Sequence, residues 1–140
     1  MPLLLEIVTP EARIFSDTVE TVVLPGSEGE MGILASHAPL VSALQPGELR
    51  YTMGGKTTEL AVGGGLVEVT GTHARVLTDM AINADDIDEK AVEEALARAK
   101  TALETLKSAH GSSDDEIAAT MAMIQRSSAQ LHLKRKRRTV

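Results

Sequence analysis

The chain contains no cysteine and no tryptophan, and its only aromatic residues are Phe15 and Tyr51. Disulfides, thiolate metal sites and a cysteine nucleophile are therefore excluded. Stacking of bases on aromatic side chains, which many nucleic-acid-binding modules use, is nearly excluded as well. Hydrophobic residues still make up 43% of the 140 residues. The core must therefore be built mainly from aliphatic side chains and methionine.

Long apolar runs are also missing. No stretch approaches the roughly 20 apolar residues that a membrane-spanning helix needs. The first residues, Met1 to Glu6, include no basic side chain of the kind that begins a signal peptide. From these two features we expect a soluble, untargeted protein.

The net charge of −6 is unevenly distributed. Residues 1–84 carry ten acidic and four basic side chains, residues 85–116 again carry ten and four, and residues 117–140 carry none and six. Opposite charges on the two arms of a hairpin formed by residues 85–140 favour pairing of the arms, and a wholly basic arm also suits an acidic partner surface.

Residues 1–84 show the pattern of an all-β domain. Short apolar stretches are separated by turn residues such as Pro25-Gly26, Pro46-Gly47 and Gly54-Gly55, and Gly54-Gly55 predicts a two-residue hairpin turn. Such spacing is typical of a sandwich or barrel of about ten short strands. The expected strands are Leu3–Val8, Arg13–Phe15, Val19–Leu24, Met31–Leu34, Leu40–Leu44, Glu48–Met53, Thr57–Val62, Leu66–Val69 and His73–Thr78. We predict an N-terminal β-sandwich domain over residues 1–84.

Residues 85–140 predict an antiparallel α-helical hairpin with a basic tail. Asp86 with Glu89 predicts the first N-cap, Gly111 the end of that helix, and Ser113 with Glu116 a second N-cap. Because the connection is short, the helices should be antiparallel. Apolar positions repeat in steps of four and three, as in a coiled-coil seam. The expected seam residues are Val92, Leu96, Ala99, Leu103 and Leu106 on the first helix, and Ile117, Met121, Ile124, Ser128 and Leu131 on the second.

Alanines are numerous on both predicted helices. Each alanine buries little area, and burial contributes roughly 25 cal/mol per Å² of apolar surface. We therefore expect a weakly held hairpin that can detach at a modest cost in free energy. The alanines expected at the seam are Ala91, Ala95, Ala99, Ala102, Ala118, Ala122 and Ala129.

The residues give little support to catalysis or to a metal site. Segment 25–40 has glycines spaced by three, but neither a following helix nor a Lys-Ser/Thr pair of a phosphate loop. We interpret it, and Gly63-Gly64-Gly65, as turns between strands. The histidines, His37, His73, His110 and His132, lack the spacing of metal ligands. No serine lies in a nucleophile elbow, so an enzyme is not expected.

Two alternative functions remain open from the residues alone. The basic cluster Lys134–Arg138 is compatible with binding to nucleic acid, with an affinity that falls steeply as salt is added. The glycine-rich loops are compatible with a β-sandwich that binds a small ligand in an apolar pocket. A short basic cluster is also commonly a solvated chain end.

Three stretches together resemble the epsilon subunit family of bacterial-type F-type ATP synthases. They are Gly26–Pro46, Gly64–Val69, and the Ile87-Asp88 start of the alanine-rich hairpin. The likeness extends from Leu3 to Leu133. It implies a non-catalytic subunit of the central rotor, peripheral at the cytoplasmic face of the bacterial cell membrane, that couples ion-driven rotation to ATP synthesis. It would reach the membrane only through the complex and would bind no nucleic acid.

The resemblance also implies partners for each part. In the family the sandwich contacts the gamma subunit and the c-ring, which would place Glu30 toward the c-ring loops, and Thr9, His37 and Ser42 on the gamma side. The hairpin is the regulatory part. When extended it opposes ATP hydrolysis, and it would then bring its basic residues to acidic surface of the alpha and beta catalytic subunits. The residues expected there are Arg126, Lys134 and Arg135, with Lys136, Arg137 and Arg138 beside them.

Some members of this family bind ATP at a motif Ile/Leu-Asp-x-x-Arg-Ala. This chain reads Ile87-Asp88-Glu89-Lys90-Ala91-Val92, with alanine at the arginine position. Because Ala91 cannot offer the forked donor of arginine, the resemblance implies weak ATP binding at most. Asp88 and Arg98 are the candidate contacts, and no cofactor is expected to be required.

Overall fold

The computed structural model describes residues 3–34, 37–109, 111 and 113–138, without the side chains of His37 and Arg138. The elements follow in the order β1 (Leu3–Val8), β2 (Arg13–Val19), β3 (Thr21–Gly26), β4 (Gly29–Leu34), β5 (His37–Leu44), β6 (Gly47–Met53), β7 (Lys56–Val62), β8 (Gly65–Gly71), β9 (His73–Thr78), β10 (Ala81–Asn83), the 3-10 turn η1 (Ala84–Asp86), α1 (Glu89–Ser108) and α2 (Asp114–Arg138). A β-sandwich followed by two helices is the predicted fold class, which is confirmed.

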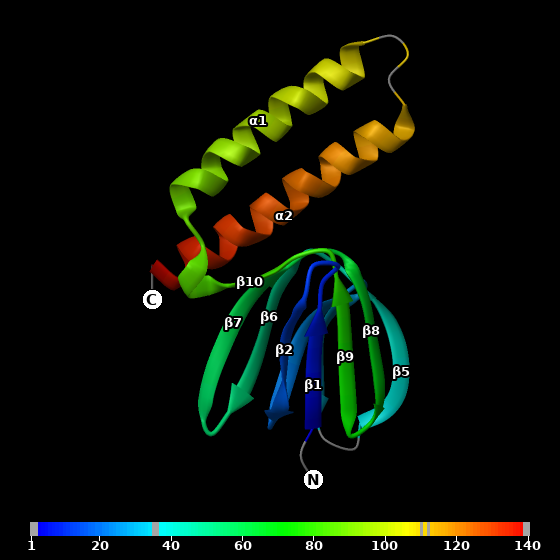
Figure 1. Ribbon diagram of the computed structural model, residues 1–140, viewed down its shortest axis with the longest axis vertical. Coiled ribbons are helices and arrows are strands. Elements are labelled where there is room, and N and C mark those ends of the chain that lie inside the picture. The colour runs from blue at the N-terminus through cyan, green and yellow to red at the C-terminus, as the bar shows by residue number, and fades with distance from the viewer. Residues whose placement is uncertain (1–2, 35–36, 110, 112, 139–140) are drawn as a thin grey trace.

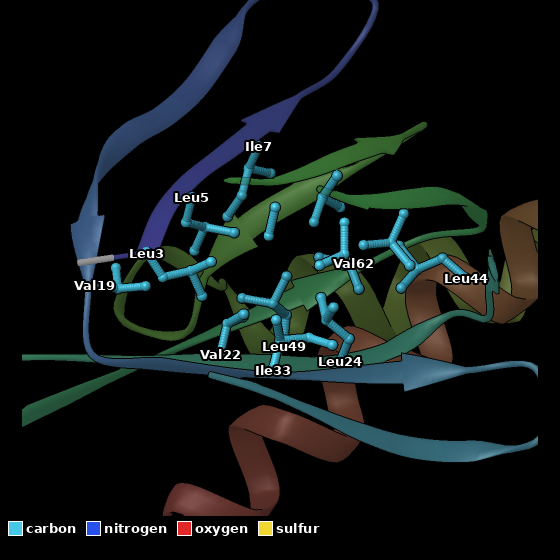
Figure 2. Packing of buried hydrophobic residues seen from close by; sticks show 14 of the residues in the cluster. Leu3, Leu5, Ile7, Val19, Val22, Leu24, Ile33, Leu44, Leu49 and Val62 are labelled. Atoms are coloured by element: carbon cyan, nitrogen blue, oxygen red, sulfur yellow. The ribbon is translucent and has the colours of Figure 1, made fainter. Parts of the chain in front are cut away.

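All strands belong to one sheet that folds over on itself. Its order is β10-β7-β6-β3-β5-β8-β9-β1-β2, and β4 pairs with β3. β1 alternates buried and half-buried residues, as a strand with one face on a core does. Figure 2 shows Leu3, Leu5 and Ile7 of β1 pointing toward Val22 and Leu24 of β3 across the interior. The two halves of the folded sheet thus share one aliphatic core.

The two aromatic residues close one side of this core. The rings of Phe15 on β2 and Tyr51 on β6 lie with their centroids 4.4 Å apart and their planes tilted by 32°. Because β2 and β6 are not neighbours in the sheet, the ring contact joins two strands that no backbone ladder connects.

The turn predictions agree with the structure. Gly54 and Gly55 have φ angles of 55° and 77° and connect the paired residues Met53 and Lys56, so they form the predicted two-residue hairpin turn. The glycine-rich segment after Pro25 forms the β3–β4 hairpin. β10 was not predicted. It is three residues long, too short to show a periodicity, and pairs with β7 at the sheet edge.

The prediction of Asp86 as the first N-cap is wrong. Asp86 belongs to η1, whose start is capped by the side chain of Asn83. Ile87 follows in extended conformation and is only 4% exposed. The N-cap is Asp88, whose carboxylate accepts a hydrogen bond from the Ala91 N–H at 3.2 Å. Burial of the Ile87 side chain, which a local capping rule does not see, delays the helix start.

The other helix boundaries are close to those predicted. α1 ends at Ser108 with Ala109 as C-cap, and Gly111 follows at a φ of 88°. The Glu116 N–H donates to Ser113 Oγ at 3.1 Å, which confirms Ser113 as the N-cap of α2. Figure 1 shows both helices at one end of the β domain, with α2 next to the domain and α1 on its far side.

The predicted seam is confirmed on α1 and only partly on α2. The α1 seam residues are buried or half-buried, but on α2 Met121 and Ser128 are exposed. Three of the predicted seam alanines, Ala91, Ala102 and Ala118, are exposed too. α2 packs against α1 on one side and against β6 and β7 on the other. A single seam therefore cannot describe its buried residues.

Candidate functional site

The contact between α2 and the β domain has a small apolar centre of its own. Ala61 on β7, Ala84, Ile87 and Leu133 are buried together, with Met80, Ile82 and Val92 packed partly buried around them. These residues form a cluster separate from the main core of the sandwich. Full burial of Ile87 and Leu133 contributes about 1.5–3 kcal/mol each as an upper estimate. The hairpin is thus attached to the sandwich but is not part of its core.

Leu133 was not among the predicted seam residues, although it is fully buried. It lies two residues after Leu131, which is 4% exposed, so the two side chains point to different sides of the helix. The sequence feature that could have predicted burial on two sides of the helix is the triplet Leu131-His132-Leu133. A search for a single apolar helix face does not detect it.

Basic side chains of α2 surround this cluster and pair with acidic groups. Arg126 Nη1 lies 3.1 Å from Asp79 Oδ2, Lys136 Nζ lies 2.9 Å from Glu48 Oε2, and Arg137 Nη1 lies 2.5 Å from Asp85 Oδ1. The Lys134 ammonium donates to the Ala84 carbonyl at 3.2 Å. The sequence predicted pairing between the two arms of the hairpin, whereas these contacts join α2 to the β domain and η1.

The absence of a side chain at Gly63 leaves room for the ion pair between Asp79 and Arg126. A Cβ at Gly63 would lie 1.8 Å from Asp79 Oδ1 and 3.3 Å from Arg126 Cγ. The Gly63 N–H also donates to the Met80 carbonyl at 2.9 Å. Only a residue without a side chain lets Asp79 and Arg126 approach the sheet this closely.

Two carboxylates on neighbouring strands share the ammonium group of Lys136. Glu48 on β6 is 2.9 Å from Lys136 Nζ and Glu59 on β7 is 3.8 Å from it. Burial raises the pKa of Glu48, but its hydrogen bonds with Glu59 and Lys136 and the nearby positive charges outweigh burial and lower it overall. The pKa of Glu59 is raised, first by its hydrogen bond to Glu48 and then by burial. Glu48 is therefore the group that stays charged to lower pH.

Arg50 joins this acidic pair to a third carboxylate. Its guanidinium donates from Nη1 and Nη2 to the two oxygens of Glu30 at 3.3 and 3.2 Å, and Nη1 lies 3.9 Å from Glu48 Oε1. The hydrogen bond to Glu30, followed in strength by burial acting in the opposite direction, leaves the pKa of Arg50 raised. An unbroken series of ion pairs thus runs from Glu30 to α2.

The residues predicted to contact gamma and the c-ring lie in more than one place. Glu30 and Ser42 line the same hollow of about 510 Å³. Thr9 lines another hollow, of about 460 Å³, is 7% exposed, and donates from Oγ1 to the Ala12 carbonyl at 3.2 Å. The side chain of His37 lies outside the described residues. Their interface roles remain predictions.

The two candidate ATP contacts are not brought together. Asp88 caps α1, and Arg98 lies ten residues further along the chain, about 15 Å away at 1.5 Å per helical residue. Arg135 pairs within the hairpin, with Glu89 at 3.3 Å and Glu93 at 2.6 Å. An ATP contact at Asp88 and Arg98 is thus still a prediction, as is a contact of Arg126, Lys134 and Arg135 with a catalytic head.

The described part of the chain contains no group of three or more His, Asp or Glu side chains arranged to hold a metal ion. Neither of its two helices has the length and apolar character needed to cross a membrane.

Comparison with known proteins identifies the family. A family model described as the β-sandwich domain of the ATP synthase delta/epsilon chain matches residues 2–84. The ATP synthase epsilon chain of Herpetosiphon aurantiacus is 39% identical over 135 residues, which span 96% of this chain and 99% of that protein. The chain belongs to the ATP synthase epsilon family. The epsilon chain of Desulforamulus reducens is 48% identical over 99 residues, 71% of this chain and 75% of that protein.

A solved structure shares the fold. A chain in the structure of the mitochondrial ATP synthase of Euglena gracilis superposes with a TM-score of 0.71 at 22% identity, over 91% of this chain and 78% of that chain. Membership in the epsilon family confirms the predicted resemblance and the prediction of a non-catalytic chain. These comparisons give no support to a nucleic-acid-binding protein or to a small-ligand sandwich.

Proposed function

We propose that this chain is the central-stalk rotor subunit of an F-type ATP synthase and couples ion-driven rotation to ATP synthesis. The observation that supports this most strongly is the 39% identity to an ATP synthase epsilon chain over both the β domain and the hairpin. Its partners are the gamma subunit, the c-ring and the alpha and beta catalytic subunits. It works at the cytoplasmic face of the bacterial cell membrane without entering it, and it requires no cofactor.

The β domain, residues 1–84, is the part proposed to contact the stalk and the c-ring. Its core is complete without the hairpin, as a domain that transmits force should be. Glu30, with a side chain 63% exposed, shares its hollow with Ser42 and is the proposed c-ring contact. Ser42, Thr9 and His37 are the proposed gamma side.

Co-purification with gamma tests the rotor assignment. The wild-type chain should bind gamma at micromolar concentration, and Ser42→Arg should weaken this binding at least tenfold by placing bulk and charge in a complementary contact. Thr18→Arg, at an exposed position of β2 at the end of the β1–β2 ladder away from Thr9, is a matched control and should bind normally. Failure of the wild-type chain to bind gamma would remove the rotor assignment.

The hairpin, residues 85–140, is the proposed regulatory arm, able to inhibit ATP hydrolysis. Arg126 and Lys134 now bind Asp79 and the Ala84 carbonyl outside the hairpin and cannot hold an acidic catalytic surface at the same time. Arg135 pairs with α1 and is released only if the two helices separate. Docking on the sandwich and contact with the catalytic head therefore exclude each other. ATP hydrolysis by the assembled enzyme should rise when residues 86–140 are deleted, and an unchanged rate would exclude an inhibitory role.

The weak ATP contact at Asp88 and Arg98 is tested by restoring the missing donor. Ala91 is exposed on the first turn of α1. Ala91→Arg should increase ATP affinity about tenfold, because a hydrogen bond to a charged group contributes about 1.5–3 kcal/mol. Titration followed by NMR would measure the change, with Ala119→Arg, at an exposed position of α2, as control. Equal affinities in the wild type and both variants would exclude this site.

A further inference from the structure

Arg50 lies between two carboxylates that differ in their exposure to solvent. On one side it holds the two oxygens of Glu30, at 3.2 and 3.3 Å, and Glu30 is largely open to solvent. On the other side it lies 3.9 Å from Glu48, whose side chain is only 13% exposed beneath Lys136 of α2. One guanidinium group is thus shared between an open carboxylate and the carboxylate that anchors the hairpin.

The sheet register explains why these groups meet. Glu48 and Arg50 are two residues apart on β6 and so lie on the same face of the sheet. Glu59 on β7 is directly opposite Arg50. Glu30 on β4 reaches Arg50 from the other side of β3, which pairs with both β4 and β6. The arrangement is fixed by backbone pairing and needs no partner molecule.

We infer that Arg50 couples the charge at Glu30 to the docking of the helical hairpin. When Glu30 is neutralised or bound by another cation, Arg50 loses its two strongest hydrogen bonds and turns to Glu48 and Glu59. There it competes with Lys136 and Arg137, which lie 2.9 and 3.8 Å from these carboxylates. As a result, the ion pairs that hold α2 on the sandwich weaken.

The burial of Glu48 makes this competition effective. Exposed ion pairs contribute little, because water and salt screen them, but the Glu48 carboxylate is mostly shielded from solvent. A cation that moves from 3.9 Å toward Glu48 changes the local potential where the ammonium group of Lys136 is held. The raised pKa of Glu59, due first to its hydrogen bond with Glu48, agrees with an excess of negative charge that these cations balance.

Docking can be measured in the isolated full chain, which has no cysteine. Spin labels at Thr72→Cys in the β8–β9 turn and Ala97→Cys on α1, both exposed, report the distance between sandwich and hairpin. The measured distances give the ratio of docked to undocked chains, and this ratio is followed in a titration with sodium chloride. Leu133→Ala, which empties the apolar centre, defines the signal of an undocked hairpin.

Glu30→Gln should lower the docked-to-undocked ratio about threefold, the size expected for neighbours in one ionic network. In an Arg50→Gln background the same substitution should have no effect. Glu28→Gln is the matched control, since it removes an equal charge two residues away with no hydrogen bond or ion pair to Arg50, and it should leave the ratio unchanged.

Three results would overturn the inference. They are an unchanged ratio in Glu30→Gln, an equal loss in Glu28→Gln, or an equal loss with and without Arg50. Circular dichroism of each variant confirms that the sandwich remains folded. Because the assay contains no other subunit, its outcome is independent of gamma binding and of the rotor assignment.

Discussion

The β domain and the helical hairpin are held by different forces. The sandwich has a continuous aliphatic core with large, fully buried side chains such as Leu3, Leu5 and Ile7. The contact of the hairpin has a small apolar centre around Leu133, with ion pairs at its edge. The stability of such a domain falls mainly when buried side chains are shortened. The stability of the hairpin contact also depends on salt and pH.

The largest expected effect is in the sandwich core. Leu5→Ala should lower the free energy of unfolding of the β domain by about 2–5 kcal/mol, because it leaves a cavity at a fully buried site. Urea denaturation followed by far-UV circular dichroism measures this. Leu34→Ala, at a side chain 59% exposed, is the control, and equal losses in both variants would contradict the burial of Leu5 in the core.

Leu133→Ala should act on the hairpin instead. Loss of this side chain removes about 2–5 kcal/mol of packing from the α2 contact but leaves the core cluster of the sandwich intact. The hairpin should undock in the spin-label assay, while the unfolding midpoint of the β domain changes little. A midpoint that falls as far as in Leu5→Ala would show that the two parts are one cooperative unit.

Gly63→Ala should weaken docking by a smaller amount. The added methyl group collides with Asp79 beside Arg126, and overpacking of this kind costs about 1–3 kcal/mol. Gly32→Ala on β4 is a matched control, because no described atom lies within 4 Å of a Cβ at that position. Equal docking in both variants, measured by the same spin labels, would contradict the role given to Gly63.

The smallest effect is the pH dependence of docking. The pKa of Glu48 is lowered below its ordinary value of 4.5, against burial, by hydrogen bonds with Glu59 and Lys136, and the bond to Lys136 of α2 is the one that depends on docking. Its contribution is therefore complete above pH 4.5 and is lost as the pH falls through the lowered pKa. The pKa of Glu59 is raised first by its hydrogen bond to Glu48 and then by burial, a contribution to the β domain that is lost as the pH rises through that pKa, whereas the charges of Lys136 and Arg137, which docking brings near, act to lower it.

We therefore expect docking to weaken as the pH falls below about 4.5. Glu48→Gln should remove this loss, and Glu68→Gln, on β8, should retain it. The docked fraction measured from pH 6 to about pH 3 checks both variants. An identical pH profile in the wild type and in Glu48→Gln would show that another group controls docking.

The sequence was sufficient for elements whose signal is local. Turn glycines marked the strands, and the four-three repeat marked the α1 seam, because α1 packs mainly against one neighbour, α2. The same rule was incomplete for α2, which packs on two sides, so Leu133 was missed. N-cap preferences do not distinguish between Asp85, Asp86 and Asp88, because all three are aspartates. Burial of Ile87 is what makes Asp88 the N-cap.

The ion pairs of the site could be predicted only in kind. Charge distribution predicted that the basic arm of the hairpin would pair with the acidic arm, as Arg135 does with Glu89 and Glu93, but not that Lys136 would meet Glu48, 88 residues earlier in the chain. The pairing of Lys136 with Glu48 depends on the register of β6 and β7 and on the angle at which α2 crosses them. Neither can be predicted from a local sequence pattern. The series from Glu30 through Arg50 to α2 is visible only once the strands are paired.

The contact between Phe15 and Tyr51 has a practical consequence for experiments on this chain. Tyr51 is the only tyrosine in a protein without tryptophan, and its ring contacts that of Phe15 between β2 and β6, two strands that do not pair with each other. Fluorescence excited in the tyrosine absorption band therefore comes from a single reporter inside the β domain. Emission would register opening of the sandwich, while the distant motion of two optically silent helices would leave the spectrum almost unchanged.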